Sequence, residues 1–258
     1  MLLLLSPAKK QDFGFDYQGK TSQCRFVSET IGLVECLRQY DVAGLQKLMG
    51  ISHSLAELNL DRYRSFCPDY SGALTRPAVM VFQGDVYQGL QAQSLTSEQR
   101  IYMQKHLRIL SGLYGVLRPL DLIQPYRLEM KTKMITPKGE GLVAFWGPKI
   151  AQAIADDFAK HASKMVVNLA SKEYFKAVDL AALGDTPILT IDFKVDKGDG
   201  PKIIGVYAKK ARGMMARYVI EHGLTEPEGM QAFNEEGYRY MPSLSKDNHW
   251  VFVKKIKA

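Results

Sequence analysis

Lysine and arginine side chains gather in two segments of this sequence, and such a gathering suits a polyanionic partner. Residues 100–138 contain eight Lys or Arg and two acidic residues, while residues 202–217 contain five and none. The net charge of the whole chain is +7, so the remaining sequence is mildly acidic. A focused positive field raises the local concentration of anions such as nucleic acid. The alternative is that the two segments form separate solvated faces that never meet.

The first basic segment contains "HLRILSGLYGVLRPLDLIQPYRLEM", in which two glycines lie between two arginines. Gly112 and Gly115 free the backbone for a tight hairpin with outward N–H groups, and Arg108 and Arg118 flank it. Hairpin amides beside basic side chains hold DNA phosphates in helix-hairpin-helix units. Two residues separate these glycines where that unit has one, so a turn inside the core is the alternative.

The second basic segment contains "YAKKARGMMARY", which has helical spacing. On a helix, Lys209 and Arg212 form one charged ridge and Lys210 and Arg217 a second, on either side of an apolar stripe. Such ridges can follow phosphates along a nucleic-acid backbone without reading bases. A solvated helix face is the alternative.

Polar residues at the ends of expected strands indicate a different kind of site, a pocket for a small anionic or nucleotide-like substrate. They occur in the segments "SPAKK", "FQGDVYQGL", "PYRLEM" and "NLASKEYFKAV". The candidate pocket residues are Ser6, Asp85, Arg127, Glu129, Asn168 and Glu173. Lys9 and Lys172 add positive charge to the first and last of these segments. Asp85 as a helix cap and Arg127 with Glu129 as a structural ion pair are the alternatives.

A closed pocket of about 300–1,000 Å³ would favour an enzyme, whereas lysines along an open groove would favour DNA. The sequence has no Walker A loop, no G-x-S-x-G motif and no H-E-x-x-H pair, and its five histidines are scattered. We therefore expect no cofactor and no tightly bound metal, and no catalytic constellation is recognisable. Three widely spaced cysteines without C-x-x-C spacing are typical of reduced thiols in the cytoplasm. No apolar run is long enough to span a membrane.

The elements that would position these residues are strands and helices interleaved without a regular βαβ rhythm. This pattern predicts a mixed α/β fold over residues 1–258, with one mixed sheet flanked by helices in a single domain. Apolar runs predict strands at 1–5, 76–82, 164–170, 188–195, 202–210 and 249–257. Helical spacing predicts helices at 27–40, 51–66, 95–106, 145–161, 172–178 and 211–223. Capping signals are Ser28, Ser54 with Glu57, Thr96 with Gln99, and Ser171.

The chain resembles the YaaA family of bacterial peroxide-stress resistance proteins in five segments that occur in the family's order: "SPAK", "FQGDVYQGL", "HLRILSGLYGVLRPLDLIQPYRLEM", "NLASKEYFKAV" and "YAKKARGMMARY". The resemblance extends from Leu2 to the expected C-terminal strand. It implies a cytoplasmic protein that limits oxidative DNA damage by keeping reactive intracellular iron low. It also implies an α/β fold with a helix-hairpin-helix-like element beside a basic cleft, and binding to duplex or structured DNA with weak sequence preference.

The family's motifs place the hairpin at Arg108, Gly112, Gly115 and Arg118. Together with the charge pattern, they place the basic cleft at Lys9, Lys172, Lys209, Lys210 and Arg212. Lys10 stands where the family more often has threonine, so this lysine can be incidental. DNA binding is the leading hypothesis, and an enzyme acting on a small anion is the alternative.

Overall fold

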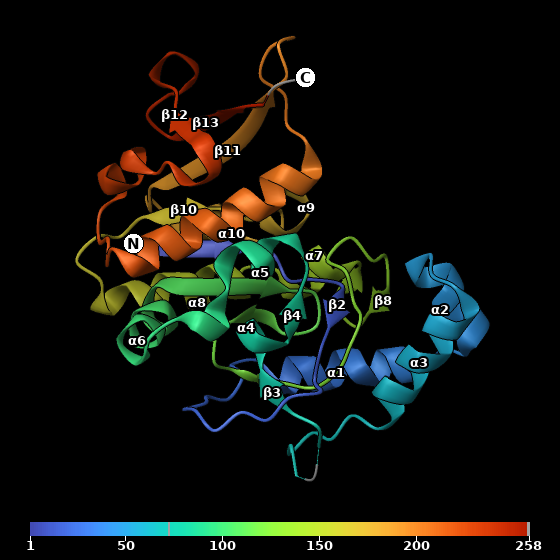
Figure 1. Cartoon of the computed structure of the whole chain (residues 1–258). Helices are drawn as coiled ribbons and strands as arrows, with labels where there is room; N and C mark the ends of the chain where they lie inside the picture. The colour runs from blue at the N-terminus through green and yellow to red at the C-terminus, as the bar shows by residue number, and fades with distance from the viewer. Residues whose placement is uncertain (72, 257–258) are drawn as a thin grey trace.

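A seven-stranded mixed sheet occupies the centre of the molecule (Figure 1). The computed structural model describes residues 1–71 and 73–256 of the chain. Five inner strands run parallel, and the two edge strands, β12 and β6, are antiparallel to their neighbours. The sheet order is β12(Tyr238–Tyr240), β13(His249–Lys255), β11(Ile188–Asp196), β10(Val166–Asn168), β1(Leu2–Leu5), β5(Leu107–Ser111) and β6(Gly115–Leu117).

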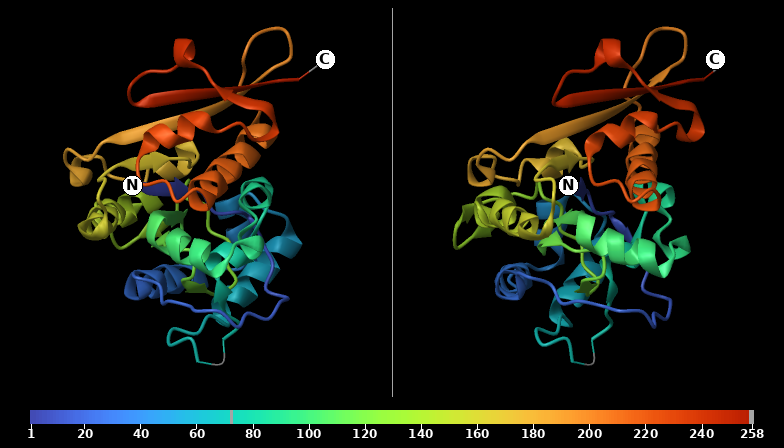
Figure 2. Two further views of the ribbon diagram at one scale, coloured as in Figure 1. Left: turned by 60° about the vertical axis from the view of Figure 1, so that its left-hand side comes forward. Right: turned by 90° about the vertical axis from the view of Figure 1, so that its left-hand side faces the viewer.

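Helices cover this sheet, so the predicted mixed α/β domain with helices around one sheet is confirmed. They are α1(Val27–Arg38), α2(Val42–Met49), α3(His53–Arg64), α4(Ala78–Val81), α5(Asp85–Leu90), α6(Ser97–His106), α7(Leu142–Trp146), α8(Lys149–Asp157), α9(Lys172–Phe175) and α10(Gly205–Glu221). Short ladders join β2(Lys10–Gln11) to β4(Phe82–Gln83), β3(Arg76–Pro77) to β7(Leu122–Ile123), and β8(Ile135–Thr136) to β9(Gly139–Glu140). In Figure 2, β12 and β13 lie at one end of the molecule and α1 near the other.

Strand β1 lies inside the sheet because its four leucines are buried on both faces. A continuous apolar run is typical of a parallel strand covered on both sides. Leu3 pairs with Val167 of β10 on one side and with Leu107 of β5 on the other. The predicted N-terminal strand is confirmed, and it becomes the strand around which the sheet is organised.

The chain reverses its direction across the sheet at β1 and β10. After β1 the chain passes to β5 on one side, and after β10 it passes to β11 on the other. In open α/β sheets, the connections that leave such a pair diverge and open a crevice at the carboxyl ends of the strands, where ligands bind. The segments beginning at Ser6 and Leu169 leave the sheet at this point.

Helices α5 and α10 touch backbone to backbone in front of the sheet (Figure 1). A Cβ atom on Gly213 would lie 1.8 Å from the carbonyl oxygen of Val86, and one on Gly89 would lie 2.2 Å from that of Lys210. Only glycine permits so close an approach at these two positions. The contact fixes the start of α5, at Asp85, relative to the basic residues of α10.

The predicted tight hairpin at Gly112 and Gly115 is present, but it joins two strands of the core and is not exposed. Residues 107–111 and 115–117 are paired strands, with Ile109 opposite Leu117, and the whole segment is buried. Gly115 has a φ of 69°, and a Cβ there would lie 2.7 Å from the ring of Trp146. A Cβ on Gly112 would lie 2.3 Å from the carbonyl oxygen of Leu128. The glycines therefore permit close packing in the core.

Two other apolar runs also fold differently from the prediction. The run 76–82, predicted as one strand, forms β3, the helical turn α4 and β4. Within the run 202–210, Lys202 pairs with Val195, and the helix α10 begins at Gly205. Short apolar runs suit a buried helix as well as a strand, so local pattern alone does not separate them.

Capping signals were confirmed at two of the four predicted positions. Thr96 and Gln99 form the predicted capping box at α6, and Ser171 caps α9. By contrast, Ser52 rather than Ser54 caps α3, and Phe26 precedes α1 without a side-chain cap.

Candidate functional site

A cleft of about 490 Å³ opens where β1 and β10 end. Its walls come from five parts of the chain that are far apart in sequence: residues 6–11, 83–87, 126–131, 169–174, and two side chains of α10, Lys209 and Arg212. It therefore occupies the crevice that the reversal of the chain at these strands creates. This position makes the cleft the best-supported site in the described part of the molecule.

Two serines hold the ends of the diverging strands together at the base of the cleft. The hydroxyl oxygen of Ser6 accepts a hydrogen bond from the backbone N–H of Ser171 at 2.9 Å, and the two hydroxyl oxygens are 3.3 Å apart. The hydroxyl of Tyr87 donates to the carbonyl oxygen of Ser6 at 3.0 Å. The segments after β1 and β10 and the helix α5 are therefore fixed relative to one another.

Glu129 lies at the centre of a cationic cluster in the cleft. One carboxylate oxygen is 3.0 Å from the Nζ of Lys9 and 3.5 Å from that of Lys131, and the other is 3.2 Å from Arg127. Burial by itself would raise the pKa of Glu129, but the hydrogen bond from Lys9 and the three positive charges outweigh it, so this pKa is lowered. The carboxylate is ionised at neutral pH and neutralises only part of the surrounding charge.

Arg212 differs from these residues because its guanidinium has no partner. Within residues 1–71 and 73–256, no hydrogen bond or ion pair involves its side chain, and its Nε is buried. Burial lowers the pKa of Arg212, while the negative charge of Asp192 acts in the opposite direction. The Nε of Arg127 is also buried without a partner in the described part of the chain. A buried N–H group without an acceptor is unfavourable unless a ligand supplies one.

The lining of the cleft is positive overall. Its cations are Lys9, Lys10, Arg127, Lys131, Lys209 and Arg212, and its carboxylates are Asp85, Glu129 and Glu173. Positive charge concentrated in a concave surface focuses the field on the cleft and favours an anionic ligand. Both basic segments of the sequence contribute, so they share one surface.

Many of the predicted site residues lie together in this cleft. These are Ser6, Lys9, Asp85, Arg127, Glu129, Glu173, Lys209 and Arg212. Two others lie beside it: Asn168 is buried and its side-chain oxygen accepts from the N–H of Ala170, while Lys172 is exposed on α9. Asp85 is the first residue of α5, and the capping position itself is Gly84, which excludes the helix-cap alternative for Asp85.

Other predicted site residues lie elsewhere, where existing contacts use their polar groups. Lys210 pairs with Glu236. Arg217 pairs with Glu221 and donates to the carbonyl oxygens of Leu90 and Gln91, which ties α10 to the end of α5. Gly112 and Gly115 are in the core hairpin, and Arg108 and Arg118 belong to a separate ion-pair network. Their predicted contact with DNA is untested, and the contacts observed are structural.

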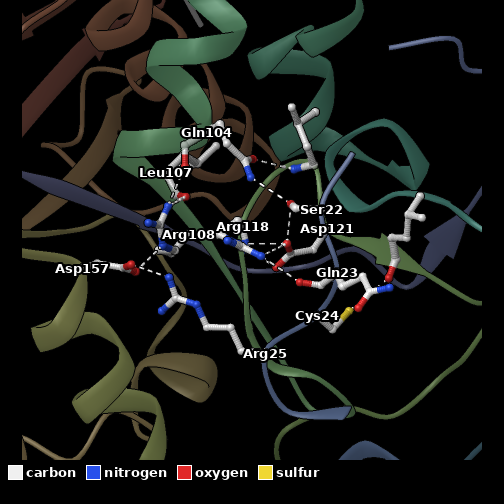
Figure 3. A network of polar contacts seen from close by, with 12 residues as sticks. Ser22, Gln23, Cys24, Arg25, Gln104, Leu107, Arg108, Arg118, Asp121 and Asp157 are labelled. Atoms are coloured by element: carbon white, nitrogen blue, oxygen red, sulfur yellow. Dashed lines mark hydrogen bonds and ion pairs between the residues drawn. The ribbon is translucent and has the colours of Figure 1, made fainter. Parts of the chain in front are cut away.

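That network joins the buried carboxylate of Asp121 and the half-buried carboxylate of Asp157 to arginines and the N-terminal loop (Figure 3). Asp157 receives hydrogen bonds from Arg25 and from Arg108, the latter at 2.6 Å. Arg118 is 2.9 Å from the buried carboxylate of Asp121. Arg25 and Arg118 also border a second cavity, but their charges are already paired. We therefore assign the network to folding rather than to ligand binding.

Several lining residues were missed from the sequence: Gln11, Gln83, Tyr126, Lys131, Ser171 and Tyr174. Lys131 carried a signal, because in an extended segment it lies on the same side as Glu129 and Arg127. Ser171 was seen only as a helix cap. The tyrosines and glutamines carried no signal, since these residue types occur throughout the chain.

Three further features of the described residues are their possible metal ligands, their cysteines and the apolar character of their helices. In the described ranges 1–71 and 73–256, no three His, Cys, Asp or Glu side chains are grouped so that they could hold a metal ion. Cys24, Cys36 and Cys67 are free cysteines. Among the same residues, we find no helix with the length and apolar character needed to cross a bilayer.

Comparison with known proteins gives matches over nearly the whole chain. A family model described as peroxide stress protein YaaA matches residues 1–244. A UPF0246 protein of Acaryochloris marina is 46% identical over 258 residues, covering 98% of this chain and 100% of the relative. UPF0246 proteins of Magnetococcus marinus and Bordetella petrii are 47% and 46% identical, and the matches cover at least 98% of this chain and 99% of each relative.

Proposed function

Because this chain belongs to the peroxide stress protein YaaA family, we propose that it acts in resistance to hydrogen peroxide and binds DNA through the basic cleft. We place this activity in the cytoplasm, where the DNA is. The further proposal that the protein keeps intracellular iron low rests on the family resemblance alone.

The observation that carries the DNA proposal is the meeting of the two basic segments in one cleft. Arg127 and Lys131 come from the first segment, Lys209 and Arg212 from the second, and Lys9 joins them from the N-terminal loop. Cations on one surface can neutralise neighbouring phosphates and release their counterions. Contacts of this kind position a nucleic-acid backbone without reading its sequence. The expected binding is therefore salt-dependent and weakly sequence-specific.

Two adjacent lysines provide a matched test of the DNA proposal. Lys209 lines the cleft, whereas Lys210 pairs with Glu236. We expect Lys209→Ala to weaken binding of all DNA sequences about equally and to reduce the log–log salt slope by about 0.9, the value for one lost phosphate contact. Lys210→Ala should leave both quantities close to wild type. Fluorescence anisotropy with duplex and branched DNA between about 50 and 200 mM salt measures them. No binding at the lowest salt, or an affinity independent of salt, would refute the proposal.

A second candidate function is an enzyme acting on a small anionic or nucleotide-like substrate. The observation that favours it is the size of the cleft, about 490 Å³, which lies in the usual range for small-ligand sites. Ser6, Asp85, Glu129 and Glu173 also converge there with the cations. Turnover of phosphate esters, followed by phosphorus NMR, would establish catalysis, and binding without turnover would favour the first function.

A further inference from the structure

Arg212 is the lining side chain of the cleft whose surroundings most favour a bound ligand. It is half-buried, its Nε is buried, and in residues 1–71 and 73–256 nothing accepts a hydrogen bond from its guanidinium. By contrast, the buried Arg108 and the half-buried Arg118 have carboxylate partners, Asp157 and Asp121. A buried guanidinium N–H without an acceptor costs free energy. An anion bound in the cleft would remove that cost.

The second contact point for such an anion is the cationic cluster around Glu129. Three cations share this one carboxylate, and the buried Nε of Arg127 has no acceptor in the described part of the chain. The cluster therefore keeps an excess of positive charge. A ligand that contacts both this cluster and Arg212 must carry more than one negative charge to balance them.

We propose that the cleft binds a phosphomonoester, with Arg212 as the principal contact. A phosphomonoester carries a charge of about −1.5 to −2 at pH 7 and offers three acceptor oxygens. The planar guanidinium fork matches two of those oxygens at once. A phosphodiester inside a DNA strand has one negative charge and two free oxygens, so a single one neutralises less of the positive charge of the cleft.

The same chemistry is available from a free nucleotide and from a 5′-phosphorylated DNA end. A DNA end as the source of the phosphomonoester rests on the proposed function. A free nucleotide as the source does not depend on it. We therefore separate the two sources by experiment. The phosphate group of either source would contact Arg212 and the cationic cluster around Glu129.

The first test uses calorimetric titration of a nucleoside 5′-monophosphate into the full chain, with the unphosphorylated nucleoside as control ligand. We expect wild type and Lys210→Met to bind the monophosphate, and Arg212→Met to bind at least tenfold more weakly. Among the described residues, Arg212 makes no hydrogen bond or ion pair that the substitution would break, so the melting temperature of the variant should equal or exceed that of wild type. Equal affinities of Arg212→Met and wild type, or no binding by wild type, would overturn the proposal.

Glu129→Gln provides a variant with the opposite expected sign. Removing this carboxylate charge leaves Lys9, Lys131 and Arg127 free to contact the ligand. The affinity for the monophosphate should then rise several-fold, in the same calorimetric titration. A fall in affinity in a folded variant would contradict the assignment of this cluster as the second contact.

DNA with and without ends distinguishes the present inference from the proposed function. Closed circular duplex DNA has no phosphomonoester, so its binding reports on the proposed function alone. Linear duplexes with 5′-phosphate or 5′-hydroxyl ends report on the inference. Binding of circular DNA without binding of any monophosphate or preference for phosphorylated ends would overturn the inference and leave the proposed function standing. Binding of the monophosphate without binding of DNA would support the inference and overturn the proposed DNA binding.

Discussion

Gly213→Ala is expected to destabilise the folded protein by about 3 kcal/mol, at the upper end of the usual cost of overpacking. The new methyl group would lie 1.8 Å from the carbonyl oxygen of Val86 and 2.8 Å from the backbone nitrogen of Leu90. Both obstacles are backbone atoms, which cannot rotate away as a side chain can. Helices α5 and α10 would have to separate along their contact. Urea unfolding followed by circular dichroism measures the loss.

Gly32→Ala is the matched control for this substitution. Gly32 also lies inside a helix, α1, but no atom lies within 4 Å of the position that its Cβ would take. Alanine is favoured over glycine in a helix by about 1 kcal/mol, so this variant should be as stable as wild type or more stable. If Gly213→Ala is as stable as Gly32→Ala, the described contact between α5 and α10 is wrong.

The contact between α5 and α10 connects packing to the site. It brings the segment "FQGDVYQGL" against "YAKKARGMMARY", so that Asp85 and Arg212 line one cleft. In the sequence, the charged residues of both segments indicated a site, whereas Gly89 and Gly213 had no predicted role. Yet a glycine inside a helical pattern lowers helix stability and usually has a packing reason. These two glycines were therefore the signal in the sequence that the two helices meet.

Elements with strong local signals were predicted correctly. The leucines of β1, the apolar run of β10, the alternating pattern of β11 and the capping box of α6 each specify their structure without distant partners. The hairpin at Gly112 and Gly115 was misread because its environment is made by residues distant in sequence, Trp146 and Leu128. Glycines free the backbone equally for a buried turn and for an exposed one, so burial decided the outcome.

The basic character of the site could be predicted from the sequence, but the residues that line it could not. Helical spacing correctly separated two basic ridges on α10, Lys209 with Arg212 and Lys210 with Arg217. Which ridge faces a cleft depends on the sheet and on acidic partners such as Glu236, which pairs with Lys210. No periodicity in the sequence contains that information. The clustering of charge therefore predicted a basic surface, while tertiary packing selected the cations that line the cleft.

Asp157→Asn is expected to reduce the free energy of unfolding by about 3–5 kcal/mol, because it leaves buried positive charge without a counter-ion. The side chain of Arg108 is 4% exposed, and its Nε donates to Asp157 at 2.6 Å. Arg25 shares the same carboxylate (Figure 3). Chemical denaturation at neutral pH measures the change. Asp199→Asn, at an exposed pair with Lys202, is the control and should leave stability unchanged.

The same carboxylate should also contribute to the acid sensitivity of the protein. Burial by itself would raise the pKa of Asp157, but the hydrogen bonds and charges of Arg108 and Arg25 outweigh it and lower this pKa. The stabilisation is thus complete above the pKa of an unfolded aspartate, about 3.9, and is lost as the pH falls through the lower folded value. Denaturation midpoints between pH 7 and pH 2 should therefore fall less steeply below about pH 4 in Asp157→Asn than in wild type. Parallel curves for the two proteins would mean that Arg108 is held by packing and by its backbone acceptors, Gln104 and Leu107, rather than by this charge.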